Sequence, residues 1–457
     1  MIKNNLHKLF YNLSNKKKLK YNLSSFFQSK IVKNLFFSSF GLLLLQGVRI
    51  FSTPITTRIL SPEDYGVSAL AGSFATVLAV ILGLGLRVFF SMEYFHLDSI
   101  KKKITLNNII LLYLVFSLPV TILFCLFPSP INKIIFSNKA PNLLIIFATL
   151  YTFLGFFTEL FFNTLSYQKK ISRMTTIQIC AAIITIALSL IFLCSLKWGV
   201  VSLMASQLIG TTIVCFIGIR EYLRTCCHKY VIPKEFSSSY KTYLKTSLAF
   251  VPGLMCAWML SSADRWLLAK YNGMHDTGIY SIAATFAQLF QIGILLPMRR
   301  AYMPAVLEKF AKNKNDLASV EKWNKRNMLF TMIALFGIIS VGFFIAKPIL
   351  RIILPPSFHP AISYIWLILV GQIFLLGEHF SSLLITFHKR VRFHAVSLFI
   401  PATLNIVLNI ILIPYLNITG CILATVISYV VYFLSKFFYN LHLQKNSAEN
   451  FEQKPNL

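Results

Sequence analysis

An adjacent acid and base, Asp264 and Arg265, lie near the end of an apolar stretch that runs from Ser247 to Leu268. Charges inside or beside a segment of hydrocarbon length cost free energy, so the pair predicts a functional site, as a ligand contact or as part of a gate. The structural alternative is that Asp264 and Arg265 only neutralise each other at a helix end.

A further cation, Arg49, lies near the middle of another apolar stretch, 34–57, and shares one helical face with Gln46, Thr53 and Thr56. The four residues are spaced i, i+3, i+7 and i+10, so the face is expected to look into protein or water. From mid-span a guanidinium does not easily reach either membrane interface. Arg49 is therefore expected to contact a ligand or to bind carbonyl groups of a neighbouring helix.

Two glutamates, Glu159 and Glu378, occupy nearly equivalent places before the basic turns at 167–170 and 387–390, and His379 follows the second glutamate. Acids inside a membrane span either bind a coupling cation or proton, or lock a cation in an ion pair. The cations considered for such a pair are Arg49 and the residues of the basic turns. The sequence leaves both interpretations open.

Other polar residues in apolar stretches have simpler explanations. Arg87, at the inner end of its stretch, is expected to extend to the headgroups, and Arg58 is expected to line an outer vestibule or to touch headgroups. Pro252 is the predicted hinge. Hydrogen bonds between helices are favoured over ligand contacts for a set of hydroxyl and amide side chains. This set is Ser281, Thr285, Gln288, Gln291, Asn405 and Asn409.

The composition predicts that these residues belong to a membrane protein. The 457 residues are 56% hydrophobic and only 13% charged, and the mean hydropathy is +0.67. These values predict an all-α polytopic membrane protein. Twelve apolar stretches come close to the ~20 residues that a membrane-spanning helix needs. Their limits are 34–57, 67–90, 107–127, 142–165, 174–195, 199–219, 246–268, 279–298, 327–347, 361–386, 393–413 and 418–440.

The distribution of basic residues predicts the orientation and explains the formal net charge of +29. Most of the 44 Lys and Arg fall in tails and loops on one side of the predicted spans, and only Arg49, Arg87 and Arg265 are assigned to spans. This asymmetry predicts that both termini are cytoplasmic. Basic residues that flank helices meet membrane lipids along one leaflet, so nucleic acid is not an expected partner.

Three landmarks recur in the two halves of the chain in the same order. Asp64-Tyr65-Gly66 corresponds to Asp276-Thr277-Gly278, with an offset of 212 positions, and the basic turns and the glycines at 199 and 420 also correspond. The repeat predicts two six-helix bundles related by a pseudo-two-fold axis near the membrane normal, which commonly enclose a central site. The expected divisions are a basic tail 1–33, bundles 34–219 and 246–440, a linker 220–245 and a tail 441–457.

Several classes of protein are excluded by missing motifs. The sequence contains no G-x-x-x-x-G-K-[ST] phosphate loop, no H-E-x-x-H and no G-x-S-x-G. The eight cysteines form neither a disulfide nor a zinc pattern. We therefore expect no catalytic residues, metal or cofactor. If the protein transports a substrate, the missing phosphate loop means that the energy would come from an ion gradient, the membrane potential or the gradient of the substrate itself.

Two stretches resemble a known family, the polysaccharide flippases of the multidrug/oligosaccharidyl-lipid/polysaccharide exporter superfamily. They are Thr57–Gly66, and Ser261–Leu268 together with Gly278–Ser281. The resemblance implies alternating access around a cationic cavity and export of undecaprenyl-pyrophosphate-linked oligosaccharides for O-antigen or capsule. It also implies a bacterial plasma (inner) membrane, with other polysaccharide-assembly membrane proteins as candidate partners.

Within this resemblance, the expected substrate-binding residues are Arg49, Arg265, Gln46, Arg58 and Asp264, because arginine forks suit pyrophosphate oxygens. Asp264 and Arg265 would lie about 27 Å along their helix, at its outer end, which favours release or gating, with Arg49 as the central contact. Glu159, Glu378 and His379 are expected to take part in coupling or in ion pairs. The alternatives are a cation-coupled exporter of small molecules from the same superfamily and a membrane glycan polymerase or ligase.

Overall fold

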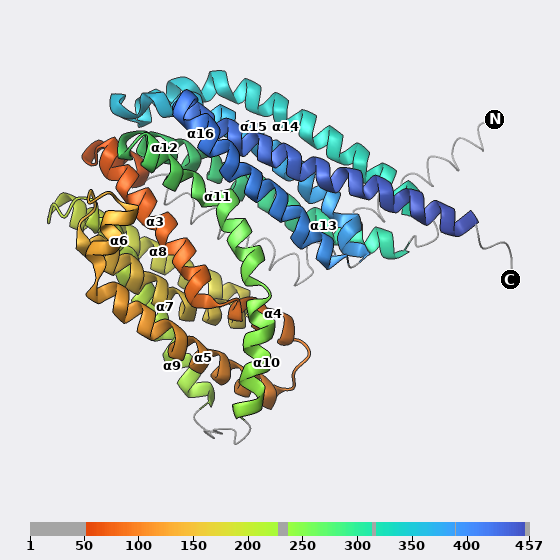
Figure 1. Cartoon of the computed structure of the whole chain (residues 1–457), viewed down its shortest axis with the longest axis horizontal. Coiled ribbons are helices and arrows are strands. Elements are labelled where there is room, and N and C mark those ends of the chain that lie inside the picture. The colour runs from red at the N-terminus through yellow and green to blue at the C-terminus, as the bar shows by residue number, and fades with distance from the viewer. Residues whose placement is uncertain (1–51, 227–235, 313–316, 389, 453–457) are drawn as a thin grey trace, which may run out of the picture.

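The computed structural model describes residues 52–226, 236–312, 317–388 and 390–452, and every regular element within these ranges is a helix (Figure 1). Ten of these helical segments are long and apolar enough to cross a membrane. One of them, Val396–Leu443, covers two of the predicted spans, and most of the first predicted span lies outside the described residues. The predicted all-α membrane fold of about twelve spans is thereby confirmed.

The helices of the first half, apart from the one at 171–194, pack around an apolar core that includes Leu70, Phe74, Tyr113 and Leu144, and the helix at 171–194 packs on the helices at 142–167 and 201–226. These helices are α3 (Pro62–Gly83), α4 (Leu86–Glu93), α5 (Ser99–Leu126), α6 (Pro128–Ile135), α7 (Asn142–Tyr167), α8 (Ile171–Cys194) and α9 (Val201–Cys226). We refer to them together as the N-terminal bundle.

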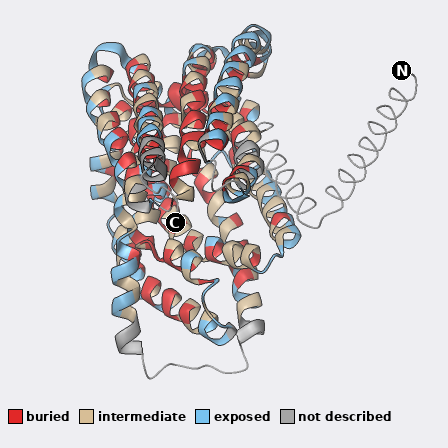
Figure 2. Ribbon diagram, turned by 90° about the vertical axis from the view of Figure 1, so that its right-hand side faces the viewer, coloured by how far each residue is buried: buried red, intermediate tan, exposed pale blue. Residues whose placement is uncertain are grey.

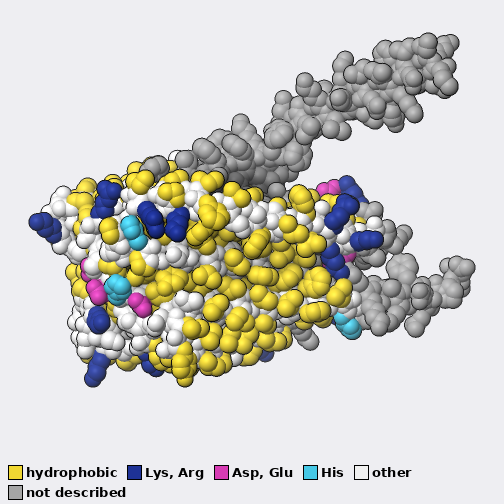
Figure 3. Space-filling model, turned by 90° about the horizontal axis from the view of Figure 1, so that it is seen from above, with side chains coloured by type: hydrophobic (Ala, Val, Ile, Leu, Met, Phe, Trp, Pro, Cys, Tyr) yellow, Lys and Arg dark blue, Asp and Glu magenta, His cyan; other side chains and the backbone are white. Residues whose placement is uncertain are grey.

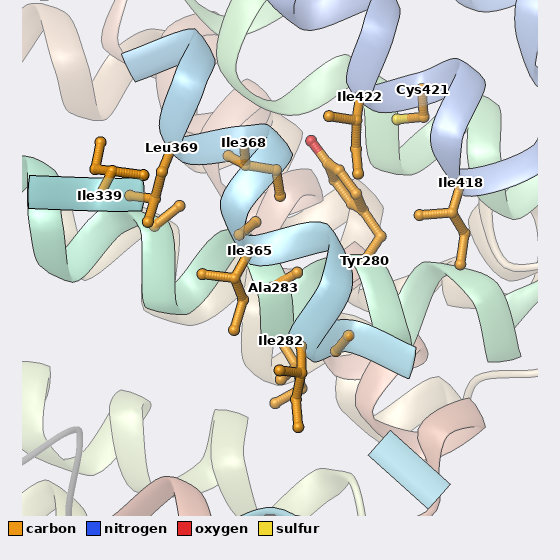
Figure 4. Packing of buried hydrophobic residues seen from close by; sticks show 14 of the residues in the cluster. Tyr280, Ile282, Ala283, Ile339, Ile365, Ile368, Leu369, Ile418, Cys421 and Ile422 are labelled. Atoms are coloured by element: carbon orange, nitrogen blue, oxygen red, sulfur yellow. The ribbon is translucent and has the colours of Figure 1, made fainter. Parts of the chain in front are cut away.

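The helix α10 (Phe236–Leu248) packs against α4 and α5 of the N-terminal bundle, and its Tyr240 and Tyr243 contact that core. The helices that follow form the C-terminal bundle. They are α11 (Val251–Tyr271), α12 (Met274–Phe290), the π-helical turn η1 (Gln291–Leu295), α13 (Leu296–Lys312), α14 (Leu317–Ile353), the 3₁₀ turn η3 (Pro356–Phe358), α15 (His359–Phe387) and α16 (Val391–Glu452). Their core joins α12, α15 and α16, and Figure 4 shows Tyr280 of α12 close to Ile368 of α15 and Ile422 of α16.

Local sequence accounts for where several helices begin and break. Ser61 caps α3 in a reciprocal capping box with Asp64, and Pro62 occupies the first turn, where its missing N–H costs nothing. The predicted span 67–90 is broken after Gly83, because Leu84 and Gly85 both adopt positive φ. The predicted span 246–268 is also broken, between α10 and α11, with Pro252 in the first turn of α11.

The two bundles meet where α3 crosses α12, and the contact is reciprocal. A Cβ on Gly66 would run into the backbone of Met274, and a Cβ on Gly278 would run into the backbone of Pro62. Residues 62 and 274 are separated by 212 positions, as are 66 and 278. The sequence repeat is therefore also a two-fold contact in space, at a crossing that only glycine allows.

A polar contact joins the bundles further along α3. The buried Ser73 accepts a hydrogen bond from Trp266 Nε1 at 2.9 Å and donates one to the carbonyl oxygen of Ser262 at 3.0 Å. Its own carbonyl oxygen accepts from Trp258 Nε1 at 3.3 Å. Figure 1 shows α3 and α11 running between the two bundles.

The molecular surface suits a bilayer. On the face that Figure 3 presents, apolar side chains cover the middle of the molecule and the Lys, Arg, Asp and Glu side chains gather toward its two ends. Buried residues are concentrated along the inside of the helical packing (Figure 2). This pattern is expected for helices that satisfy their backbone internally and expose apolar side chains to lipid.

Candidate functional site

A cavity of about 560 Å³ lies inside the C-terminal bundle, among α11, α12, α15 and α16. Its wall carries five acidic or basic side chains, counting histidine and leaving out the tyrosines, and they fall into two groups. The first group is Asp264 and Arg265, and the second is Glu378, His379 and Lys436. The site therefore combines residues from both ends of the second half of the chain.

The first group shows how the Asp264 carboxylate is held. The Tyr280 hydroxyl of α12 donates to Asp264 Oδ2, and the backbone N–H of Arg265 donates to Oδ1 at 2.8 Å. The Arg265 guanidinium approaches Oδ1 through Nη1 at 3.7 Å and donates from the same atom to the carbonyl oxygen of Ser261 at 3.2 Å. Asp264 is thus satisfied twice over by neutral donors.

The Arg265 guanidinium keeps donors for a ligand. Within the described residues its hydrogen bonding is confined to Nη1, so Nη2 and Nε remain available on a side chain that is 13% exposed. A guanidinium presents its five N–H donors in a planar fork, which pairs with phosphate or carboxylate oxygens. Arg265 can therefore bind an anion at the cavity wall without releasing Asp264.

The second group is an ion-paired cluster. Lys436 Nζ of α16 donates to Glu378 Oε1 of α15 and, at 3.1 Å, to the Tyr432 hydroxyl. His379 Nδ1 lies 2.6 Å from Glu378 Oε2, and the Ser382 hydroxyl donates to Glu378 Oε1 at 3.1 Å. Both carboxylate oxygens of Glu378 therefore have charged or polar partners.

Lys436 is a cavity residue that the sequence analysis did not single out. Its side chain is 1% exposed and lies inside the bundle. The sequence does indicate that Lys436 lies inside the bundle, because it falls within the predicted span 418–440 and continues the helical face of Thr425, Tyr429 and Tyr432. Its partner, Glu378, lies 58 positions away and could not be identified from spacing.

The remaining predicted residues lie elsewhere. Glu159 of α7 is 59% exposed and pairs with Arg87 of α4, so Arg87 does not simply extend to the headgroups and the two glutamates are not brought together. Arg58 is exposed and outside the cavity. Gln46 and Arg49 lie outside the described residues, so their roles stay predictions.

Three glutamines line the cavity. Gln288 and Gln291 were expected to link helices, and the structure places both on the cavity wall, together with Gln372 of α15, which the sequence analysis did not single out. Asn405 and Asn409 do form hydrogen bonds within the bundle, since Asn409 Nδ2 donates to Asn405 and Asn405 Nδ2 lies 3.4 Å from Thr425 Oγ1.

The sequence matches a family model described as polysaccharide biosynthesis protein over residues 55–363. A comparison with curated protein sequences finds no significant match.

The fold is similar to that of solved transporters. One is the inward-facing conformation of a multidrug resistance MATE family transporter of the MOP superfamily, with a TM-score of 0.67 and 14% identity over 89% of this chain and 96% of that chain. Another is the lipid II flippase MurJ in an inward closed conformation, with a TM-score of 0.64 and 17% identity over 92% of this chain and 87% of that chain. An outward-facing MATE family transporter of the MOP superfamily gives a TM-score of 0.55 and 15% identity over 93% and 98%.

Proposed function

The chain belongs to the polysaccharide biosynthesis protein family, and from this premise we propose that it is a flippase for lipid-linked oligosaccharides. The substrate would be an undecaprenyl-pyrophosphate-linked unit for a surface polysaccharide such as O-antigen or capsule. It would cross a bacterial plasma membrane by alternating access between the two bundles, while both termini face the cytoplasm.

The observation that carries the proposal is a polar, charged cavity inside a membrane-spanning bundle. Buried polar groups in a membrane are costly and mark pathways for polar substrates. The cavity offers Arg265 donors for pyrophosphate and amide and hydroxyl groups for sugars. The polyprenyl tail needs no site in the protein, because it can stay in the lipid.

The arrangement of the bundles supports an inward-facing state. The α3–α12 crossing at Gly66 and Gly278 lies at the ends of these helices that are expected on the outer side. The TM-score is also higher with the inward-facing MATE structure than with the outward-facing one. In this state the substrate would enter from the cytoplasmic leaflet. We propose that Arg49 and Arg265 would both contact the pyrophosphate.

A cation-coupled exporter of small molecules is the second candidate, because solved multidrug transporters have the same fold. The cavity argues against it. Asp264 is held by Tyr280 and Arg265, and Glu378 by Lys436 and His379, so neither carboxylate is spare for an organic cation.

The test uses a strain whose surface glycan depends on this gene. Arg265→Ala should reduce glycan display about tenfold or more and leave lipid-linked oligosaccharide on the cytoplasmic leaflet, because hydrogen bonds to charged groups are lost. Arg173→Ala is the matched control. Arg173 forms an exposed pair with Glu221 outside the cavity, and its loss should change display little. Normal display by Arg265→Ala, at equal membrane abundance, would show that the proposed mechanism is wrong.

A further inference from the structure

The cavity extends to the end of the C-terminal bundle that faces the cytoplasm in the proposed function. Along α15 its wall runs from Ile368 to Thr386, which is about 27 Å of helix and ends at the basic turn. Met303 of α13 also lines the cavity, and it packs beside Leu383 near this end of α15. The helix α13 is therefore part of the wall at the inner end of the cavity.

The helix α13 is held to the bundle by a small core of its own. Its Val306 and Phe310 are fully buried and pack against α14 and α15, in a cluster whose buried residues are distinct from those of the main core. At its other end α13 joins α12 through the π-helical turn η1, and helices bend at such turns. A helix held in this way can move as a unit while the bundle stays folded.

A chain of polar groups fastens α13 to α14 and α15. The Tyr302 hydroxyl of α13 donates to Asn324 Oδ1 at 3.0 Å, and Asn327 Nδ2 donates to the Tyr302 oxygen at 3.3 Å. The Asn324 amide donates in turn to the carbonyl oxygen of Phe380 at 3.3 Å and to Glu321 Oε2 at 3.4 Å. The position of the Asn324 side chain, and with it the bond to Tyr302, therefore depends on Glu321.

Glu321 is a buried acid that the proposed transport mechanism does not use. Val320 and Trp323, on either side of it, pack against α13. Glu321 is 1% exposed, and its carboxyl group forms no salt bridge with any residue that the structure describes. A buried carboxylate without a cation costs more free energy than the neutral acid. The packing of α13 therefore favours a protonated Glu321.

The charged and titratable groups around Glu321 come from four helices. Tyr302 of α13 and Lys325 of α14 act on it electrostatically. Lys325 Nζ lies 5.5 Å from the centre of the Phe437 ring of α16, and Lys309 Nζ of α13 lies 3.8 Å from the centre of the Trp323 ring. The charges of Glu378 on α15 and Lys436 on α16 are paired with each other.

The location of Glu321 gives it access to protons from one side of the membrane. With 37 residues, α14 is much longer than the ~20 residues that cross a bilayer, and Glu321 precedes the predicted span 327–347. Burial raises the pKa of Glu321 to about 7, and the opposing effects of Lys325 and of the Asn324 amide are smaller. An exposed glutamate has a pKa of about 4.3.

We propose that α13 is a lid on the inner end of the cavity, which closes when Glu321 binds a proton and opens when Glu321 releases it. The neutral acid favours the closed lid fully below pH about 4.3, where Glu321 is protonated in both states, and this advantage is lost as the pH rises through about 7. Between pH 6 and pH 8 the ratio of closed to open lids should fall about tenfold. Acidification of this side would close the cavity, whatever the substrate.

The reaction of single cysteines with a membrane-impermeant maleimide tests the lid on the purified full chain, after the native cysteines have been replaced. Val306→Cys places a thiol under the lid, and Ala305→Cys places one on its exposed face. The ratio of the two rates cancels the effect of pH on the thiol itself. This ratio should rise about tenfold from pH 6 to pH 8, because a buried thiol reacts through the open state. Thr386→Cys, at the inner end of the cavity, should show the same rise.

Two variants and one native residue test the origin of the rise. Glu321→Gln stays neutral, so its ratio should be low and equal at both pH values. Glu308→Gln is the matched control, because Glu308 is an exposed acid of α13 that pairs with Lys312, and the rise should be kept. Cys421, retained as the single cysteine in the main core, should stay unreactive at both pH values. Tyr302→Phe should raise the ratio at pH 6, because it removes the bond to Asn324 without touching the acid.

The outcomes separate the lid from the proposed function. A ratio that does not change with pH, or a rise that persists in Glu321→Gln, would overturn the role of Glu321. A rise in Val306→Cys without one in Thr386→Cys would show that α13 does not cover the cavity, and reaction of Cys421 at pH 8 would show that the whole bundle loosens instead. Each of these results leaves the flippase function intact, since that function is tested by glycan display.

Discussion

Substitution of Gly66 by alanine should open the crossing between the two bundles. The added Cβ would lie 2.9 Å from the carbonyl carbon of Met274 and 3.0 Å from the backbone nitrogen of Gly278, and closer still to the Met274 carbonyl oxygen. All three neighbours are backbone atoms, so no side-chain rotation relieves the overlap. The helices must separate by a distance on the order of 1 Å, at a cost of about 1–3 kcal/mol.

This cost falls only on conformations in which α3 and α12 cross closely. If the crossing closes the outer side in the inward-facing state, Gly66→Ala shifts the population away from that state by a factor of about 5 to 150. Gly72 is the matched control on the same helix, because a Cβ there meets no atom within 4 Å. Gly72→Ala should leave the equilibrium unchanged.

The shift can be measured with spin labels at Glu63→Cys and His275→Cys, after the native cysteines have been replaced. Both positions are exposed, and they flank the crossing 212 positions apart. Distances measured by pulsed electron resonance should be short in the parent and in Gly72→Ala, and a longer population should appear in Gly66→Ala. Identical distributions in Gly66→Ala and Gly72→Ala would refute the assignment of the crossing to the outer closure.

Two further variants test the buried polar contacts. Lys436→Met should lower the free energy of unfolding by about 3–5 kcal/mol, because it leaves Glu378 buried without its cation. The double variant Lys436→Met, Glu378→Gln should recover most of the lost stability. If thermal unfolding in detergent gives the two variants equal stability, the ion pair does not have this role. Ser73→Ala should lower the free energy of unfolding by about 1–3 kcal/mol and shift the fluorescence emission of Trp266, because the indole N–H loses its acceptor. Ser68→Ala, on the same helix, is the control and should change neither quantity.

The fold was largely predictable, because its strongest signals are local. Apolar length defines the spans, and the Asp-x-Gly repeat, from which no contact was predicted, lies at the crossing of Gly66 and Gly278. The limits of the span 67–90 were less accurate. Its break depends on positive φ at Leu84, which hydropathy does not reveal.

The site was less predictable, because its contacts join distant segments. Asp264 and Arg265 were identified from their cost in an apolar stretch, but the Tyr280 hydroxyl that holds Asp264 comes from the next helix. Lys436 was not singled out, because a lysine near the end of a span is usually taken as interfacial. Gln372 is a single amide in an apolar helix and has no periodic signal.

The contact between Gly66 and Gly278 also has the form of an interface between identical subunits. Each glycine receives the backbone that precedes the other, which is how a surface meets its own copy in a symmetric dimer. Because the two copies are here joined in one polypeptide, the crossing keeps its symmetry while the rest of each half can diverge. The polar cavity, whose wall is built from residues of the second half, lies in a part of the chain that this freedom covers.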